Sequence, residues 1–131
     1  MWSTARSAVA LAVLLVSGCG VSDDEGQARI AARDFYASVQ AREGAGACER
    51  LAPPTAESLE RQEARRCEEA VLTLDLGDGP PRRVQLFQTE AVVTLGGGEK
   101  AYLDRRAGGW KVTAAGCAST GAGPADCELG D

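Results

Sequence analysis

A glycine- and proline-rich segment at residues 77–81 separates two parts of the chain whose apolar residues recur with different periods. Before this segment, apolar side chains recur at the spacing of one helix face, which is typical of amphipathic helices. After it, apolar and polar residues alternate in short segments, which is typical of strands with one buried face. Helices followed by an antiparallel meander predict an α+β fold, with the N-terminal helices packed on one face of a curved antiparallel sheet of four or more strands.

Three helical segments are expected in the first part. The first spans residues 27–43, and the glycines at 44 and 46 are expected to end it, because glycine disfavours helix interiors and is common just after a helix. A second helix is expected over residues 55–66, capped by its first threonine, and a further helical piece over residues 67–74. The expected core face of the first helix comprises Ala28, Ala31, Ala32, Phe35 and Val39.

Four strands are expected in the second part, with glycine-rich hairpin turns at residues 96–98 and 107–109. Alternation predicts an apolar inner face formed by Val84, Leu86, Ala91, Val93, Leu95, Ala101, Leu103, Trp110, Val112 and Ala114. The charged strand residues have the opposite parity and are expected to face solvent: Arg83, Glu90, Asp104, Arg106 and Lys111. A bulge at Gln88–Thr89 would change this assignment.

The first residues of the chain have the organisation of a secretory signal peptide. Arg6 precedes an apolar run from Ala8 to Val16, and the small residues Ser17 and Gly18 follow it. As a helix this run of nine residues is about 14 Å long, which is too short for the ~30 Å hydrocarbon core of a bilayer. The end of the segment, Val-Ser-Gly before Cys19, resembles the bacterial lipobox. That resemblance implies that Cys19 receives a diacylglyceryl group; the alternative is an ordinary cleaved signal in which Cys19 has no role.

These features predict three segments: a lipoprotein signal peptide at residues 1–18, a lipidated Cys19 with a flexible tether at 19–26, and a single α+β domain at 27–131. Two acyl chains suffice for stable membrane anchoring. The expected location is the extracytoplasmic face of the cell membrane, to which the chain binds through diacylglyceryl-Cys19. Anionic headgroups would repel the acidic residues at 23–25, so the domain is not expected to lie flat on the lipid.

The cysteine count agrees with this organisation. The chain has five cysteines, and an odd number in an exported protein normally indicates a free thiol or an intermolecular bridge. Lipidation of Cys19 would leave four, for which three pairings exist. Cys48 with Cys67 and Cys117 with Cys127 are favoured because each bridge closes a local loop, and the second would hold the C-terminal tail against the sheet. A zinc site is disfavoured because closely spaced cysteine pairs and histidines are both missing from the sequence.

Composition excludes several classes of function. Fourteen Lys and Arg residues stand against 19 Asp and Glu residues, giving a formal net charge of −5. Nucleic-acid binding, which depends on basic clusters, is therefore not expected. The sequence contains no histidine, the commonest general base and metal ligand. No catalytic constellation, metal site or cofactor site is evident, so we do not expect an enzyme.

Three segments resemble a family of small actinobacterial lipoproteins with a nuclear transport factor 2-like domain, also called SnoaL-like or cystatin-like. The segments are residues 31–36, 47–51 and 108–117. The resemblance implies a cone-shaped arrangement of helices and sheet. Enzymes of this superfamily place a carboxylate or phenol inside the cone, whereas the expected inner positions here carry no proton-transferring group. Residues that could line a pocket in such a cone are Tyr36, Tyr102 and Trp110.

The expected function is that of a non-catalytic binding or interaction module of the bacterial cell envelope. Its partner would be a hydrophobic small ligand held in the cone, an envelope protein, or a second copy of the chain in a homodimer. Two alternatives stay open: a small-molecule isomerase or hydrolase of the SnoaL-like type, and an accessory subunit of an envelope transport or signalling complex.

Overall fold

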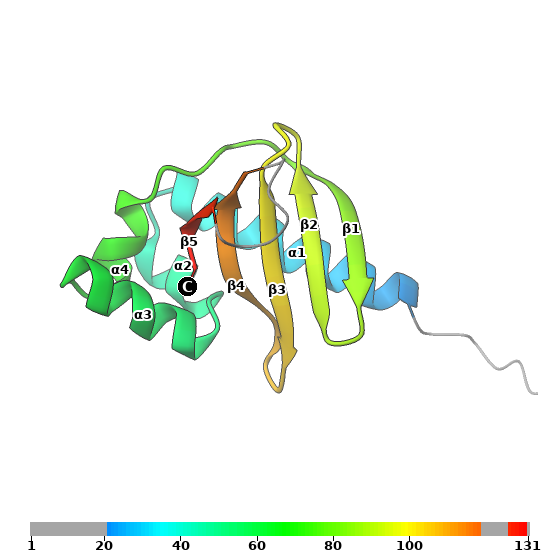
Figure 1. The fold of residues 1–131 in the computed structure, drawn as a ribbon, viewed down its shortest axis with the longest axis horizontal. Helices are drawn as coiled ribbons and strands as arrows, with labels where there is room; N and C mark the ends of the chain where they lie inside the picture. Colours follow the sequence, from blue (N-terminus) through cyan, green and yellow to red (C-terminus); the bar gives the residue numbers. More distant parts are fainter. Residues whose placement is uncertain (1–20, 119–125, 131) are drawn as a thin grey trace, which may run out of the picture.

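The computed structural model describes residues 21–118 and 126–130, and its helices precede its strands, as the sequence predicts (Figure 1). A short helix at 44–49 and a short strand at 127–129 were not predicted. The expected signal peptide and Cys19 lie outside the described residues. The helices are α1 (Val21–Gln40), α2 (Gly44–Glu49), α3 (Pro53–Glu63), α4 (Cys67–Ala70) and the 3₁₀ helix η1 (Val71–Thr73). The strands are β1 (Pro81–Phe87), β2 (Glu90–Leu95), β3 (Lys100–Arg106), β4 (Gly109–Cys117) and β5 (Cys127–Leu129).

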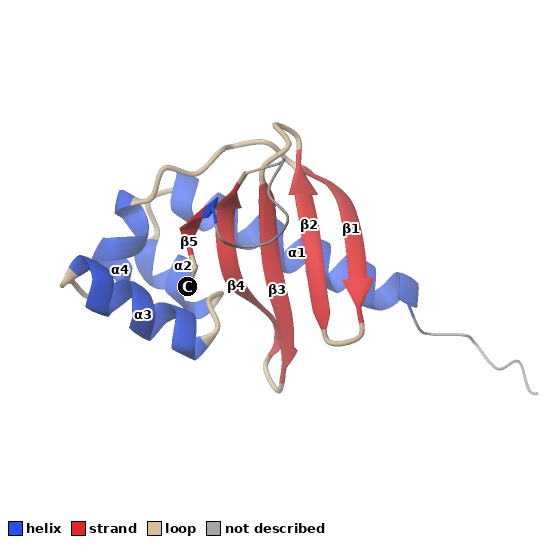
Figure 2. Cartoon of the chain, viewed as in Figure 1, coloured by secondary structure: helices blue, strands red, loops and turns tan. Residues whose placement is uncertain are grey.

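The strands form one antiparallel sheet in the order β1-β2-β3-β4-β5, so each strand pairs with its neighbour in the chain. Helix α1 crosses one face of this sheet, and α2, α3 and α4 gather beyond the β4–β5 edge (Figure 2). Among the described residues, no helix covers the opposite face (Figure 2). The predicted α+β fold, with helices packed on an antiparallel sheet, is confirmed.

The core lies between α1 and the sheet and is filled by apolar side chains. All five residues of the expected core face of α1 are buried there. The alternating strand positions are buried from Ala91 to Val112, while Val84 and Leu86 of the edge strand are only partly covered. The largest fully buried side chains include Phe35, Leu95, Leu103, Val71, Val93 and Val112.

Helix α1 starts earlier than predicted, and the flexible tether expected through residue 26 is wrong from Val21 onward. The polar composition of this segment suggested a linker, but its acidic side chains suit a first helical turn, where the helix dipole is positive. Asp23 accepts a hydrogen bond from Gln27 at 2.9 Å, and Glu25 pairs with Arg29 at 3.3 Å. Both contacts join residues four positions apart and stabilise the helix locally.

Other helix boundaries also differ from the prediction. Helix α1 ends at Gln40, and the two glycines expected to follow it lie inside α2. Helix α3 begins at Pro53 rather than at Thr55, because proline at the first helical position loses no hydrogen bond. It ends at Glu63, where Ala64 adopts a left-handed conformation with φ of 50°.

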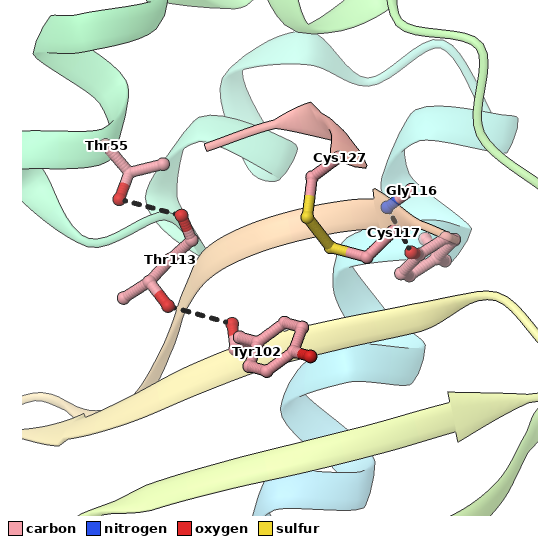
Figure 3. Close-up of a disulfide and its surroundings, with 7 residues drawn as sticks. Thr55, Tyr102, Thr113, Gly116, Cys117 and Cys127 are labelled. Carbon is pink, nitrogen blue, oxygen red and sulfur yellow. Dashed lines mark hydrogen bonds between the residues drawn. A yellow bond between two sulfur atoms is a disulfide. The ribbon is translucent and has the colours of Figure 1, made fainter. Parts of the chain in front are cut away.

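A bulge in β4 places one predicted inner residue on the outer face. Leu103 lies opposite Val112 but Tyr102 lies opposite Ala114, so Thr113 is an extra residue. The predicted inner position of Ala114 is therefore wrong, and Ala115 joins the core in its place. The Thr113 hydroxyl donates to the Tyr102 carbonyl oxygen at 3.2 Å, and the Thr113 carbonyl oxygen accepts from Thr55 (Figure 3).

The bulge considered at Gln88–Thr89 is not formed. These two residues make the turn between β1 and β2, since Phe87 and Glu90 on either side of them are paired. The positive φ of 56° at Gln88 is the conformation that a two-residue hairpin turn requires. Parity is thus regular along β2, as the sequence predicted.

Both predicted disulfides are confirmed. Cys48 in α2 is bonded to Cys67 at the start of α4, with a Cα–Cα distance of 6.1 Å. Cys117 is bonded to Cys127 across β4 and β5, where the two residues are directly opposed (Figure 3). The first bridge joins two short helices, and the second attaches β5 to the sheet. The C-terminal segment is therefore held against the sheet as predicted, with residues 119–125 outside the described part.

Candidate functional site

The three residues predicted to line a pocket do not come together. Tyr36 and Trp110 are buried on the helix side of the sheet. Tyr102 lies opposite Val92 and Ala114, on the outer face, while its neighbours Ala101 and Leu103 point into the core. The inclusion of Tyr102 with the other two is wrong, because successive strand residues point to opposite faces.

Tyr36 lies on α1 with only 4% of its surface exposed. Its hydroxyl oxygen accepts a hydrogen bond from the Gly116 N–H at 3.1 Å. Burial raises the pKa of the Tyr36 hydroxyl, and the nearby Glu99 carboxylate raises it further, whereas the Gly116 contact acts in the opposite direction. The phenol is therefore protonated at neutral pH and joins α1 to the end of β4.

Glu99 completes this group and was not singled out by the sequence analysis. Its Oε1 accepts a hydrogen bond from the Gly77 N–H at 3.0 Å, while its Oε2 is buried without a hydrogen-bond partner among the described residues. The contact joins the β2–β3 turn to the segment that leads into β1. Glu99 follows three glycines, and this position suggests only a turn. The sequence therefore carries no signal that predicts a buried carboxylate oxygen at Glu99.

Trp110 lies at the opposite end of the sheet, next to the turn between β3 and β4. It is 6% exposed, and its indole Nε1 is buried without a hydrogen-bond partner in the described part of the chain. Arg105, directly opposite on β3, places its guanidinium 5.2 Å from the centre of the indole ring. The same Arg105 forms an ion pair with Asp24 in the first turns of α1. Arg105 thus joins the sheet to α1 and also covers the indole ring of Trp110.

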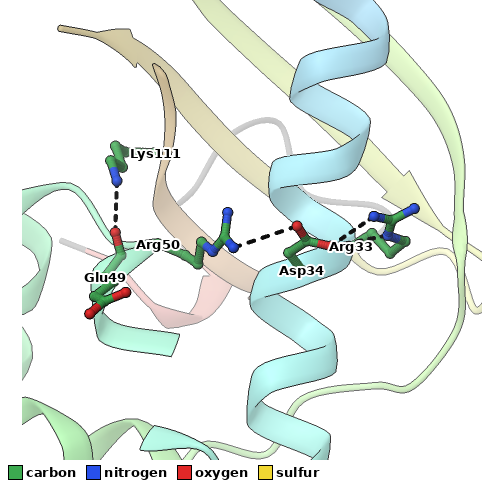
Figure 4. Close-up of polar contacts among 5 residues, drawn as sticks. All are labelled: Arg33, Asp34, Glu49, Arg50 and Lys111. Atoms are coloured by element: carbon green, nitrogen blue, oxygen red, sulfur yellow. Dashed lines mark hydrogen bonds and ion pairs between the residues drawn. The ribbon is translucent and has the colours of Figure 1, made fainter. Parts of the chain in front are cut away.

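A second ionic group joins α1 to the chain after α2 (Figure 4). Asp34 of α1 lies 3.6 Å from Arg50 and 2.9 Å from Arg33. Lys111 of β4 donates to the Glu49 carbonyl oxygen at 2.8 Å. Residues 50–52 also form main-chain hydrogen bonds with Val112. The chain after α2 thus forms a parallel β-bridge with β4.

In the described part of the chain, Glu99 lies near Tyr36, but Asp34 and Glu90 do not converge with this pair on one point. Asp34 is held by two arginines and its side chain is 29% exposed, Glu90 is exposed, and Tyr36 is engaged with Gly116. The four cysteines of the domain are bonded in disulfides. Within residues 21–118 and 126–130 there is no group of three or more metal-ligating side chains.

An open depression lies on the surface at the turn between α3 and α4. It contains none of the predicted pocket residues, and charged side chains of both signs surround it. Its lining comprises Glu60, Arg61, Ala64, Arg65, Arg66 and Glu69.

Comparisons of the chain with protein-family models, with curated proteins and with solved structures find no match. The helices in the described part are all too short or too polar to cross a membrane. The function proposed below therefore depends on the chain's own residues and their geometry.

Proposed function

We propose that this chain is a lipid-anchored domain on the extracytoplasmic face of the cell membrane, attached through a diacylglyceryl group on Cys19. The observation that carries the proposal is the number and pairing of the cysteines. Four of the five cysteines are paired in two disulfides. Cys19 is the one left over, and it stands directly after an apolar run and two small residues. Lipidation of Cys19 through a thioether bond would account for this fifth cysteine.

The two disulfides also support the proposed compartment. Disulfides form and persist where the surroundings are oxidising, as outside the cytoplasmic membrane of bacteria. Each bridge joins separate elements of the domain rather than adjacent residues. A signal peptide at residues 1–18 would deliver the chain to that compartment before the bridges form.

We further propose that the domain is a non-catalytic binding or interaction module of the cell envelope. Supporting this, apolar side chains fill the space between α1 and the sheet. The phenol of Tyr36 is protonated and hydrogen-bonded, and the carboxylate of Asp34 is neutralised by arginines. An isomerase or hydrolase would need such groups to face a shared cavity.

The anchor is tested by expressing the full chain in an actinobacterial host and determining the mass of the N-terminal peptide. The wild-type chain is expected in the membrane fraction, resistant to high salt and soluble in detergent, with diacylglycerol on Cys19. Cys19→Ala should carry no fatty acid. Ser17→Ala, which keeps a small residue before the cysteine, is the matched control and should be lipidated. A wild-type protein whose Cys19 is unmodified would refute the proposal.

The binding role is tested with Trp110, the only tryptophan that remains once residues 1–18 are removed. A hydrophobic ligand that binds next to Trp110 should change its fluorescence in a saturable manner. Titration with fatty acids, steroids and short apolar peptides provides this measurement. If none of them changes the emission, the interaction module must act through its surface, and crosslinking in intact cells would then identify an envelope protein partner.

A further inference from the structure

The attachment of α1 to the sheet bears on how the domain is oriented at the membrane. The helix begins at Val21, two residues after Cys19. The Asp24–Arg105 ion pair holds its first turns against β3, and Arg29 donates to the Pro81 carbonyl oxygen of β1 at 3.3 Å. The chain therefore leaves the domain at a defined place.

The distance from the domain to a lipid on Cys19 is short. Two residues span at most about 7 Å when fully extended. Acyl chains inserted in the hydrocarbon would place Cys19 among the headgroups, so the first turn of α1 would lie at the membrane surface. A tether through residue 26 would have allowed a larger separation, whereas a helix from Val21 leaves only Gly20 between Cys19 and the domain.

The part of the sheet next to this turn is the end that carries the β1–β2 and β3–β4 turns, residues 88–89 and 107–108, which we call the hairpin end. Arg105 belongs to it: its side chain contacts Asp24, and its N–H donates to the Thr89 carbonyl oxygen at 2.7 Å. The β2–β3 turn lies at the other end of β2, a strand of six residues and about 20 Å.

The hairpin end presents an apolar side chain to its surroundings. Phe87, the last residue of β1, is 55% exposed and lies on the outer face of the sheet opposite Glu90. Aromatic side chains are stable at the boundary between headgroups and acyl chains. An exposed phenylalanine at the hairpin end is compatible with contact between this end and lipid.

The acidic residues at 23–25 oppose this contact less than the sequence suggested. Asp24 is paired with Arg105, and Glu25 is paired with Arg29. Near the β3–β4 turn, Arg106 pairs with Asp104 and Lys111 lies opposite Asp104 on β4, while Glu90 lies opposite Phe87. Ion pairing therefore reduces the repulsion between anionic headgroups and the carboxylates of Asp24 and Glu25.

We propose that the hairpin end lies on the lipid surface, with Phe87 at headgroup level and the β2–β3 turn pointing away from the membrane. This inference rests on the proposed lipidation of Cys19. It makes the lipid bilayer the partner of the hairpin end and leaves the β2–β3 turn, Gly96–Gly98, furthest from the membrane.

The orientation is tested with single tryptophans in the lipidated mature protein, using Trp110→Phe as the background. Phe87→Trp reports on the hairpin end and Gly97→Trp on the opposite end. Both sites accept the larger side chain, since Phe87 is exposed and a Cβ on Gly97 meets nothing within 4 Å. Circular dichroism and thermal unfolding verify that each variant is folded.

Each variant is reconstituted into vesicles of phosphatidylcholine and phosphatidylglycerol that contain a lipid with a nitroxide quencher near the headgroup. Phe87→Trp is expected to lose most of its fluorescence, while Gly97→Trp keeps the emission it has in vesicles without quencher. Equal quenching of both, or stronger quenching of Gly97→Trp, overturns the orientation. The mass of the N-terminal peptide is measured in the same samples. Unmodified Cys19 would refute the anchor together with the orientation, whereas lipidated protein with the wrong quenching order would refute the orientation alone.

Discussion

Gly44 lies so close to Glu68 that a Cβ atom added to the glycine would be 1.9 Å from the Glu68 carbonyl oxygen. Helices α2 and α4 therefore pack backbone to backbone beside the Cys48–Cys67 bridge. No side-chain rearrangement can relieve such a clash, because the obstructing atom belongs to the main chain. Glycine is needed here for close approach rather than for its backbone freedom.

Gly44→Ala should consequently destabilise the domain by about 2 kcal/mol or more, since overpacking forces a backbone shift. Gly46→Ala is the matched control in the same helix, where the nearest atom to the new Cβ is the Ser38 hydroxyl oxygen at 3.5 Å. It should be neutral or stabilising, because alanine favours the helix by about 1 kcal/mol. Urea unfolding measures both; similar effects of the two substitutions would contradict the close packing.

The two disulfides should contribute separately to stability. Replacing Cys48 and Cys67 together by serine is expected to lower the free energy of unfolding by about 3 kcal/mol on the loop-entropy model. The same change at Cys117 and Cys127 should have a slightly smaller effect, because its loop is shorter, with a sequence separation of 10 against 19. Thermal unfolding of the two double variants shows which bridge contributes more to stability.

The presence of both bridges can be verified by mass spectrometry. The intact mass should increase by about 4 Da on full reduction, and a smaller increase in the wild-type protein would show that a bridge is missing.

Tyr36 should make the stability of the domain depend on alkaline pH. Its folded-state pKa is raised, so folding favours the protonated phenol. The stabilisation is fully present below the unfolded-state pKa of about 10 and is lost as the pH rises above it. The wild-type free energy of unfolding should fall with pH in that range, relative to Tyr36→Phe, by up to about 1.4 kcal/mol per pH unit.

At neutral pH, Tyr36→Phe should cost about 1 kcal/mol, because the Gly116 N–H loses its acceptor. Tyr102→Phe, a change on the outer face, is the control and should keep the wild-type pH dependence. Guanidinium unfolding between pH 7 and 11 provides the comparison. Parallel curves for the wild type and Tyr36→Phe would rule out the buried phenol as the source.

Ala64 ends α3 in a left-handed conformation that alanine adopts at a cost. Ala64→Gly should therefore stabilise the domain by about 0.5–1 kcal/mol. The same substitution within the helix, Ala56→Gly, should destabilise it by about 1 kcal/mol. Opposite shifts in the thermal midpoint are the expected result, and destabilisation by both changes would contradict the left-handed helix end.

Much of the fold could be predicted because it depends on local patterns. The buried face of α1 follows from the spacing of its alanines and Phe35, and the strand positions follow from alternation. The disulfide pairing follows from loop length alone. The exceptions have tertiary causes: Thr113 is an extra residue because its hydroxyl and carbonyl are bound by β3 and α3. No alternation of apolar residues signals that bulge.

The candidate site was less accessible to prediction. Trp110 is buried on the inner face, as alternation predicted, and Tyr36 is buried as well. Tyr102 could have been excluded from their group by its place between Ala101 and Leu103. The partners of the buried groups could not be foreseen. Arg105 covers Trp110 and pairs with Asp24, which is 81 positions away in the sequence. Glu99 contacts Gly77 only because the β2–β3 turn lies beside the segment that leads into β1.

The sequence by itself determined the order of helices and strands, the inward faces and the pairing of the cysteines, because hydrophobic periodicity and loop closure act over short stretches of chain. Only the tertiary structure decided which end of the sheet the first turns of α1 meet. That feature depends on charges such as Asp24 and Arg105, whose attraction becomes effective only after folding brings them together.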